Sequence, residues 1–260
     1  MNPKIIFKGK LNELSKEKFY SLINVPADSS EALIYFHCLW GNQKHFHRET
    51  LKGLNKTCSD TKTKTFFSII WHAPFPGYKP NWDAADEKGK KLKKVFEWIT
   101  ELYPQKTNVL CHSMGNRVFQ GVMQEMNKDS LKKKCIKEIV FAAGDVNADV
   151  FTDDYKNLSQ MAQRIHIYKH SNDRLLKFSK FRLHEKRLGL NGPENADSLL
   201  KLHKNIFLID VTETSSWRRP EPSNHVYFYW NPAVRKNLND IFLHKESLSE
   251  DKKQTIYLYY

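Results

Sequence analysis

The chain has 260 residues, of which 40% are hydrophobic and 13% aromatic, so its composition excludes an intrinsically disordered protein. A chain of this length can bury one sizeable core, and we expect a single domain over residues 1–260. No apolar run approaches the roughly 18 residues that span a bilayer, and the first residues are too short an apolar stretch for a secretory signal, which predicts a cytoplasmic protein.

The formal net charge is +13, from 42 Lys and Arg against 29 Asp and Glu. Basic surfaces attract polyphosphates, but the basic residues are spread over helix-like segments at 88–94, 128–137 and 177–187, and none of these carries a nucleic-acid-binding motif. We therefore expect no specific nucleic-acid partner. A solvated basic face is favoured over a general attraction to anionic surfaces such as membranes or acidic substrates.

The four cysteines are too few and too unevenly spaced for a disulfide framework or a paired metal site. We expect reduced thiols, in agreement with a reducing compartment.

The predicted elements alternate between strand and helix along the chain. Six apolar runs are suited to buried strands, and they lie at residues 32–36, 66–71, 108–111, 139–143, 165–168 and 206–209. Apolar residues at helical spacing predict helices over 86–102 and 114–126. Residues 74–80 are too rich in proline for either element. This order is typical of an α/β fold, with a mostly parallel sheet covered by helices on both faces.

The segment Cys111-His112-Ser113-Met114-Gly115 follows one of these strands and opens an amphipathic helix. A nucleophile elbow occupies this position, because the tight turn lifts the serine above the sheet edge and the helix N-terminus supplies backbone N–H groups. Small residues are needed on both sides of the turn; Gly115 meets that need, whereas Cys111 replaces the usual glycine. The alternative is a serine-bearing turn in another kind of α/β protein.

A serine nucleophile needs a base, which in turn needs a carboxylate to orient it. In this fold class the chain order is serine, acid, histidine. Asp173 lies just past the strand at 165–168, so it is the favoured acid, with Asp145 and Asp149 as rivals. Each of the three could also be an ordinary loop or helix-cap residue.

The favoured base is His225, which follows the last strong strand after a loop long enough to return over the sheet. His203 precedes that strand, and His244 lies in the final helix-like segment. A surface or packing role for His225 is the alternative.

An oxyanion hole requires two backbone N–H groups. Met114 directly follows the serine and is expected to supply one. The other is assigned to Leu39, in the loop after the strand at 32–36, where Cys38 replaces a glycine found in many hydrolases.

With these residues, the chain resembles a bacterial family of α/β-hydrolases of unknown substrate, related to lipases and esterases. The matching stretches lie between about residue 30 and about residue 240, at positions 34–37, 111–116, 142–147, 168–173, 187–189, 209–212 and 225–228. The resemblance implies the α/β-hydrolase fold and places Ser113, Asp173 and His225 on the triad of that family. It names no substrate.

Two other groups of residues are weighed for a site. His37, His45 and His47 could suggest a metal site, but no recognisable ligand set is completed, so a polar loop without metal is expected. Trp71, Trp217, Arg218 and Arg219 are expected at the substrate rim, where the arginines would prefer an anionic ester or acid. Surface aromatics and solvated arginines are the alternative.

The sequence therefore predicts a serine hydrolase that cleaves an ester or related acyl bond without a cofactor. The substrate is expected to be a small-molecule or lipid-like acyl compound, with an anionic group as one option. An acyltransferase that uses the same triad is a second reading, and a non-catalytic binding module with a site narrowed at Cys38 and Cys111 is a third.

Overall fold

The apolar runs of the sequence form the middle of one parallel sheet. The computed structural model describes residues 14–23, 30–39, 51–71, 77–128, 135–214, 223–244 and 255–257. Within these ranges every neighbouring pair of strands is parallel. The strands are β1 (Glu31–Phe36), β2 (Thr63–Ile69), β3 (Thr107–His112), β4 (Ile136–Ala142), β5 (Ala162–Lys169), β6 (Ile206–Asp210) and β7 (Thr255–Tyr257).

The strand order is β2-β1-β3-β4-β5-β6-β7. The chain moves outward from β1 to β2 and then returns to the other side of β1 as β3, so the direction of winding reverses between β1 and β3. In open parallel sheets, ligands bind at the carboxyl edge beside such a switch point, because the loops on either side of it diverge. This topology draws attention to the turns that follow β1 and β3.

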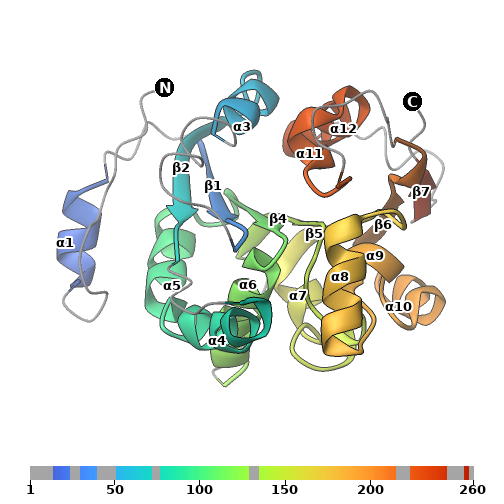
Figure 1. Ribbon diagram of the computed structural model, residues 1–260. Coiled ribbons are helices and arrows are strands. Elements are labelled where there is room, and N and C mark those ends of the chain that lie inside the picture. The colour runs from blue at the N-terminus through green and yellow to red at the C-terminus, as the bar shows by residue number, and fades with distance from the viewer. Residues whose placement is uncertain are drawn as a thin grey trace.

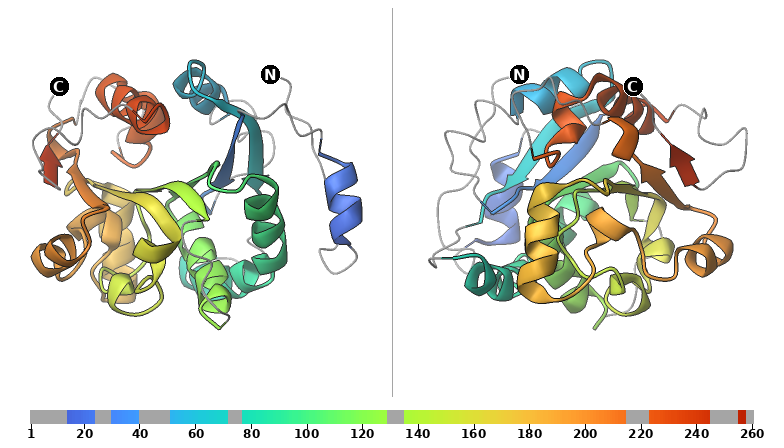
Figure 2. Two further views of the ribbon diagram at one scale, coloured as in Figure 1. Left: turned by 180° about the vertical axis from the view of Figure 1, so that it is seen from behind. Right: turned by 45° about the vertical axis from the view of Figure 1, so that its right-hand side comes forward.

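Helices cover both faces of the sheet, as Figures 1 and 2 show. On one face lie α3 (Leu51–Thr57), α11 (Tyr227–Trp230) and α12 (Pro232–Phe242), which contact one another. The helices of the opposite face and its edges are α1 (Lys16–Ser21), α4 (Tyr78–Lys90), α5 (Lys93–Leu102), α6 (Gly115–Met126), α7 (Leu158–Met161), α8 (Arg174–Leu183), α9 (Leu188–Asn191) and α10 (Ala196–Leu202). Two short 3₁₀ helices are η3 (Val150–Thr152) and η4 (Thr212–Thr214).

Alternation along the strands divides the core into two layers. In β1, Leu33 and Tyr35 join the cluster under α3, α11 and α12. The intervening Ile34 and Phe36 join the larger cluster under α4, α5 and α6. All residues of β1, β3 and β4 are buried, as expected for central strands that are covered on both faces.

Helices α4 and α6 approach each other closely because each presents a glycine at the contact. A Cβ at Gly89 would lie 1.8 Å from the carbonyl oxygen of Val118, and one at Gly121 would lie 2.0 Å from that of Asp86. Side chains at either position would therefore force the helices apart. This contact fixes α6, the helix that begins just after Ser113.

The predicted fold class is confirmed, and the differences are local. The segment predicted as one helix over 86–102 is two, because the chain turns at residues 91–92 between α4 and α5. The prediction that residues 74–80 form no element is wrong from Tyr78 onward: α4 begins there and holds Pro80 in its first turn, where backbone N–H groups have no helical acceptor. Strand β7 has no counterpart among the predicted strands.

In the part of the chain that the structure describes, every helix is too short or too polar to cross a membrane.

Candidate active site

Ser113 stands in a strained turn between β3 and α6. Its φ angle is 54°, in the left-handed region that residues other than glycine rarely adopt. The turn is held by three backbone hydrogen bonds: Ser113 N–H donates to the Ala142 carbonyl (3.1 Å), and the Ser113 carbonyl accepts from Asn116 N–H (3.0 Å) and from Asp145 N–H (3.2 Å). This is the backbone geometry predicted for a nucleophile elbow.

The two positions flanking the turn are small because backbone and core surround them. A Cβ at Gly115 would lie 2.2 Å from the Phe36 carbonyl oxygen and 2.7 Å from that of His37, so only glycine fits between α6 and the end of β1. Cys111, at the other flank, is fully buried in the core of the sheet. Burial also raises the pKa of its thiol well above the usual value. The cysteine therefore acts as a small apolar residue at this position.

Two backbone donors lie at the switch point between β1 and β3. Met114 is the N-cap residue of α6, and Leu39 lies in the turn that follows β1. Within the described ranges, neither the Met114 N–H nor the Leu39 N–H donates a hydrogen bond. These are the groups that the sequence assigns to an oxyanion hole.

Asp173 is fully buried and divides its carboxylate between two partners. Its Oδ1 accepts a hydrogen bond from the backbone N–H of Leu176 (2.9 Å), which caps the N-terminus of α8. Its Oδ2 lies 2.7 Å from Nδ1 of His225. The helix cap therefore fixes the orientation of the oxygen that meets the imidazole.

The loop that carries His225 is fastened to the loop that carries the acid. Arg174 N–H donates to the Ser223 carbonyl (2.9 Å), and Asn224 Nδ2 donates to the Asn172 carbonyl (3.4 Å). His225 itself is buried. The segment that follows β5 thus holds the segment that carries the imidazole.

His112, the residue before the serine, contacts His225 directly. Its Nε2 lies 3.2 Å from the His225 carbonyl oxygen, and the two rings are 5.0 Å apart. A carbonyl only accepts, so Nε2 of His112 carries the proton and Nδ1 accepts from the hydroxyl of Tyr35 (3.4 Å). Burial, followed by the nearby His225, lowers the pKa of His112, which keeps its ring neutral. Sequence reasoning missed this residue; its position inside the elbow motif is the only local signal.

The hydroxyl of Ser113 forms no hydrogen bond with any residue in the described part of the chain. The structure therefore joins His225 to Asp173 and brings His112 against His225, without a bond between Ser113 and the imidazole. In enzymes without substrate, hydrogen bonds between catalytic groups are often long and shorten when substrate binds.

Of the two rival acids, Asp145 lies next to the elbow but is engaged elsewhere. Its Oδ1 accepts from the hydroxyl of Ser179 (2.6 Å), and its Oδ2 accepts from the hydroxyl of Tyr78. Burial raises the pKa of Asp145, although these two hydroxyls oppose that shift. Asp145 therefore ties α4 and α8 to the turn that carries Ser113.

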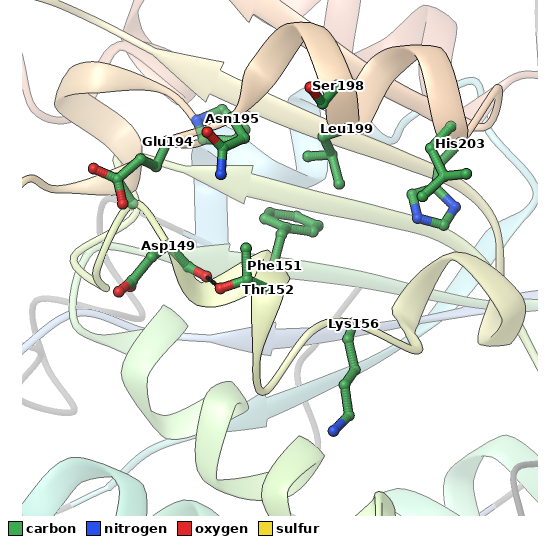
Figure 3. A pocket seen from close by; sticks show the side chains of 12 residues that line it. Asp149, Phe151, Thr152, Lys156, Glu194, Asn195, Ser198, Leu199 and His203 are labelled. Carbon is green, nitrogen blue, oxygen red and sulfur yellow. Dashed lines mark hydrogen bonds between the residues drawn. The ribbon is translucent and has the colours of Figure 1, made fainter.

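Asp149, the other rival, lies at an exposed cavity of about 420 Å³ between η3 and α10. Figure 3 shows Phe151 and Leu199 in the middle of this cavity, with Asp149 and Glu194 on one side and His203 on the other. Neither Ser113, Asp173 nor His225 lines it. Asp149 is thus separate from the site at the carboxyl edge.

Of the residues expected at the rim, Trp71 is described and is buried rather than exposed, with 7% of its surface accessible. Its backbone N–H donates to Nε2 of His37 (3.2 Å), and its indole N–H donates to the His37 carbonyl (3.1 Å). This pair of bonds joins the segments that follow β1 and β2. Trp217, Arg218, Arg219, His45 and His47 lie outside the described residues.

All four cysteines are free thiols; Cys58 and Cys111 are buried, and Cys38 and Cys135 are partly exposed. In the ranges that the structure describes, no group of three His, Cys, Asp or Glu side chains is arranged to hold a metal ion.

A parallel sheet with helices on both faces and a strained serine turn at its carboxyl edge defines an α/β-hydrolase. The sequence pattern of the family described as "alpha/beta hydrolase of unknown function (DUF900)" matches residues 28–241, and the chain belongs to this family. The expected kinship with an α/β-hydrolase family of unknown function is thereby confirmed. No curated protein matches the chain significantly.

Proposed function

We propose that the protein is a serine hydrolase that cleaves an ester or related acyl bond, with Ser113 as nucleophile, His225 as general base and Asp173 as the orienting acid. The observation that carries the proposal is the 2.7 Å contact between His225 Nδ1 and Asp173 Oδ2, together with the positive φ of Ser113, whose neighbour His112 contacts the ring of His225. Membership in a family of α/β-hydrolases supports it independently.

The reaction follows from the roles that these groups can take. Nδ1 of His225 donates to Asp173, which leaves Nε2 as the acceptor of the Ser113 proton. The serine oxygen attacks the carbonyl carbon, and the N–H groups of Met114 and Leu39 receive the negative oxygen. His225 then protonates the leaving alcohol. Water attacks the acyl-enzyme after giving a proton to His225, and the acid product leaves as the proton returns to Ser113.

The surroundings of the imidazole suit this cycle. Asp173 stabilises the positive ring that forms in each half-reaction, and the neutral ring of His112 adds no like charge beside it. His112 also holds the backbone of His225 through the bond to its carbonyl, so the base remains in place while its proton moves.

Labelling with a fluorophosphonate, which phosphonylates activated serines, tests the proposal. The wild-type protein is expected to take up one label on Ser113, and Ser113→Ala is expected to take up none. Ser171→Ala serves as the matched control, because Ser171 is an exposed serine on the acid loop whose removal leaves the elbow intact. Label on another residue, or no label on folded wild-type protein, would contradict the proposal; the second result would favour a non-catalytic binding module.

A further inference from the structure

Two large aromatic side chains are exposed next to each other on α8. Phe178 is 48% accessible and Phe181 is 72% accessible. Residues three apart share a helix face, so the two rings form one apolar patch. The ring of Phe178 contacts that of Tyr78 at 5.8 Å between centroids, and the ring of Phe181 lies 6.3 Å from that of His184, but much of both side chains remains exposed to solvent.

The same helix carries four cations and no acidic residue. Arg174, Lys177, Lys180 and Arg182 are all exposed, and none of them forms an ion pair with the residues that the structure describes. Lys177 donates to the amide oxygen of Asn172 (3.2 Å), which is uncharged. Among the residues that the structure describes, no ion pair therefore neutralises the positive charge of α8, in a chain whose formal net charge is +13.

The opposite side of α8 is fixed to the body of the protein, so the exposed face cannot turn inward. Leu176 is buried in the core, and the hydroxyl of Ser179 is bonded to Asp145. Asp173 caps the first turn. Figure 1 shows α8 at the front surface of the molecule. The two phenylalanines and the four cations are thus held outward by the packing of the helix.

We propose that α8 docks on an anionic lipid surface. Interfacial helices bind such surfaces with aromatic side chains that enter the boundary of the acyl chains and with Lys and Arg that contact the headgroups. A bilayer surface supplies both an apolar phase for Phe178 and Phe181 and negative charge for the four cations. Because Asp173 is the N-cap residue of this helix, docking would bring the lipid beside the candidate active site. The proposal does not depend on catalysis.

Co-sedimentation with vesicles tests this in the Ser113→Ala background, where no lipid can be consumed by the proposed activity. The protein is mixed with vesicles of phosphatidylcholine alone, or with vesicles that also contain phosphatidylserine. The test variants are Phe178→Ser/Phe181→Ser and Lys177→Gln/Lys180→Gln. The matched control is Lys201→Gln/Leu202→Ser on α10, since Leu202 is 75% accessible and adjoins an exposed lysine. Circular dichroism and thermal unfolding verify that each variant is folded.

We expect at least ten-fold stronger partitioning onto the phosphatidylserine vesicles. Each substituted phenylalanine should lower partitioning about ten-fold, and each substituted lysine about five-fold, so each double variant shows the product of its two effects. The α10 control should bind as the parent does. The proposal is overturned if the parent does not bind, if the control loses as much as the α8 variants, or if the phenylalanine changes have no effect. It is also overturned if soluble polyglutamate binds α8 as tightly as the vesicles, because an acidic polypeptide would then be the better partner.

Discussion

Asp173 and His225 are 52 residues apart in the sequence, and the structure brings Oδ2 of the first within 2.7 Å of Nδ1 of the second. The same carboxylate caps α8 through its other oxygen. One side chain therefore performs a folding task and orients the imidazole at the same time, which separates it from the nearby Asp145, whose oxygens meet Ser179 and Tyr78.

Exchanging each of these acids for its amide should distinguish them. Asp173→Asn keeps an oxygen that can cap α8 but loses the acceptor that fixes the imidazole tautomer, so we expect kcat for an ester substrate to fall about 10⁴-fold. Asp145→Asn should change kcat less than about ten-fold, because Asp145 is not bonded to His225. Steady-state kinetics measure both values of kcat. A larger loss for Asp145→Asn than for Asp173→Asn would show that Asp173 is not the orienting acid.

His112 is expected to act as a positioning residue for the base. His112→Phe keeps the ring but removes the hydrogen bond to the His225 carbonyl, so we expect kcat to fall about 10- to 100-fold as the base shifts. His112→Gln retains a donor and should recover part of the loss. Equal activity of the phenylalanine variant and wild type would remove His112 from the site.

The elements that bear the site were predictable from sequence because their signals are local. The apolar runs that became β1, β3, β4, β5 and β6 are buried on both faces, and such strands carry continuous hydrophobic patterns. The turn at Ser113 sits where a strand pattern changes to a helix pattern. The order of Ser113, Asp173 and His225 then followed from the chain order of the fold class, whereas their catalytic roles stay a prediction.

What sequence reasoning missed depends on packing between distant segments. The bond from His112 to His225 joins residues 113 positions apart. The burial of Trp71 and its two bonds to His37 likewise join separate segments, while its place at the substrate rim stays a prediction. The helix that begins at Tyr78 was not predicted because the stretch around it is rich in proline. Proline is tolerated in the first turn of a helix, but the sequence does not show that Pro80 lies in the first turn of α4.

Stability should decline in mild acid as buried histidines take up protons in the unfolded chain. Burial lowers the pKa of His37 from 6.5 to about 4. Between pH 6.5 and pH 4, His37 therefore binds a proton in the unfolded chain but not in the folded protein. The free energy of unfolding consequently decreases as the pH falls from 6.5 toward 4. The contribution of His37 is about 3 kcal/mol. His112, whose pKa is shifted in the same direction, adds to it.

Urea unfolding at pH 7 and at pH 4 measures this effect. His37→Gln should lose less free energy of unfolding between the two pH values than wild type does, because it removes one titrating group. His184→Gln, at an exposed histidine, is the control and should show the wild-type difference. An unchanged pH dependence in His37→Gln would show that proton uptake at this residue does not set acid stability.

The contact between α4 and α6 gives a prediction about the support of the nucleophile turn. A methyl group at Gly121 would lie 2.0 Å from the Asp86 carbonyl oxygen and 2.8 Å from the Asp86 Cα, and backbone atoms cannot move aside as a side chain would. Alanine favours helix over glycine by about 1 kcal/mol, but overpacking should outweigh this gain, so we expect Gly121→Ala to lower the free energy of unfolding by about 3 kcal/mol. Lys88→Ala, on α4 away from the contact, should change the free energy of unfolding by less than about 0.5 kcal/mol.

Because α6 begins just after Ser113, the rate of fluorophosphonate labelling should fall with stability in Gly121→Ala and remain at the wild-type value in Lys88→Ala. A Gly121→Ala protein as stable as wild type would mean that the helices are not in this close contact.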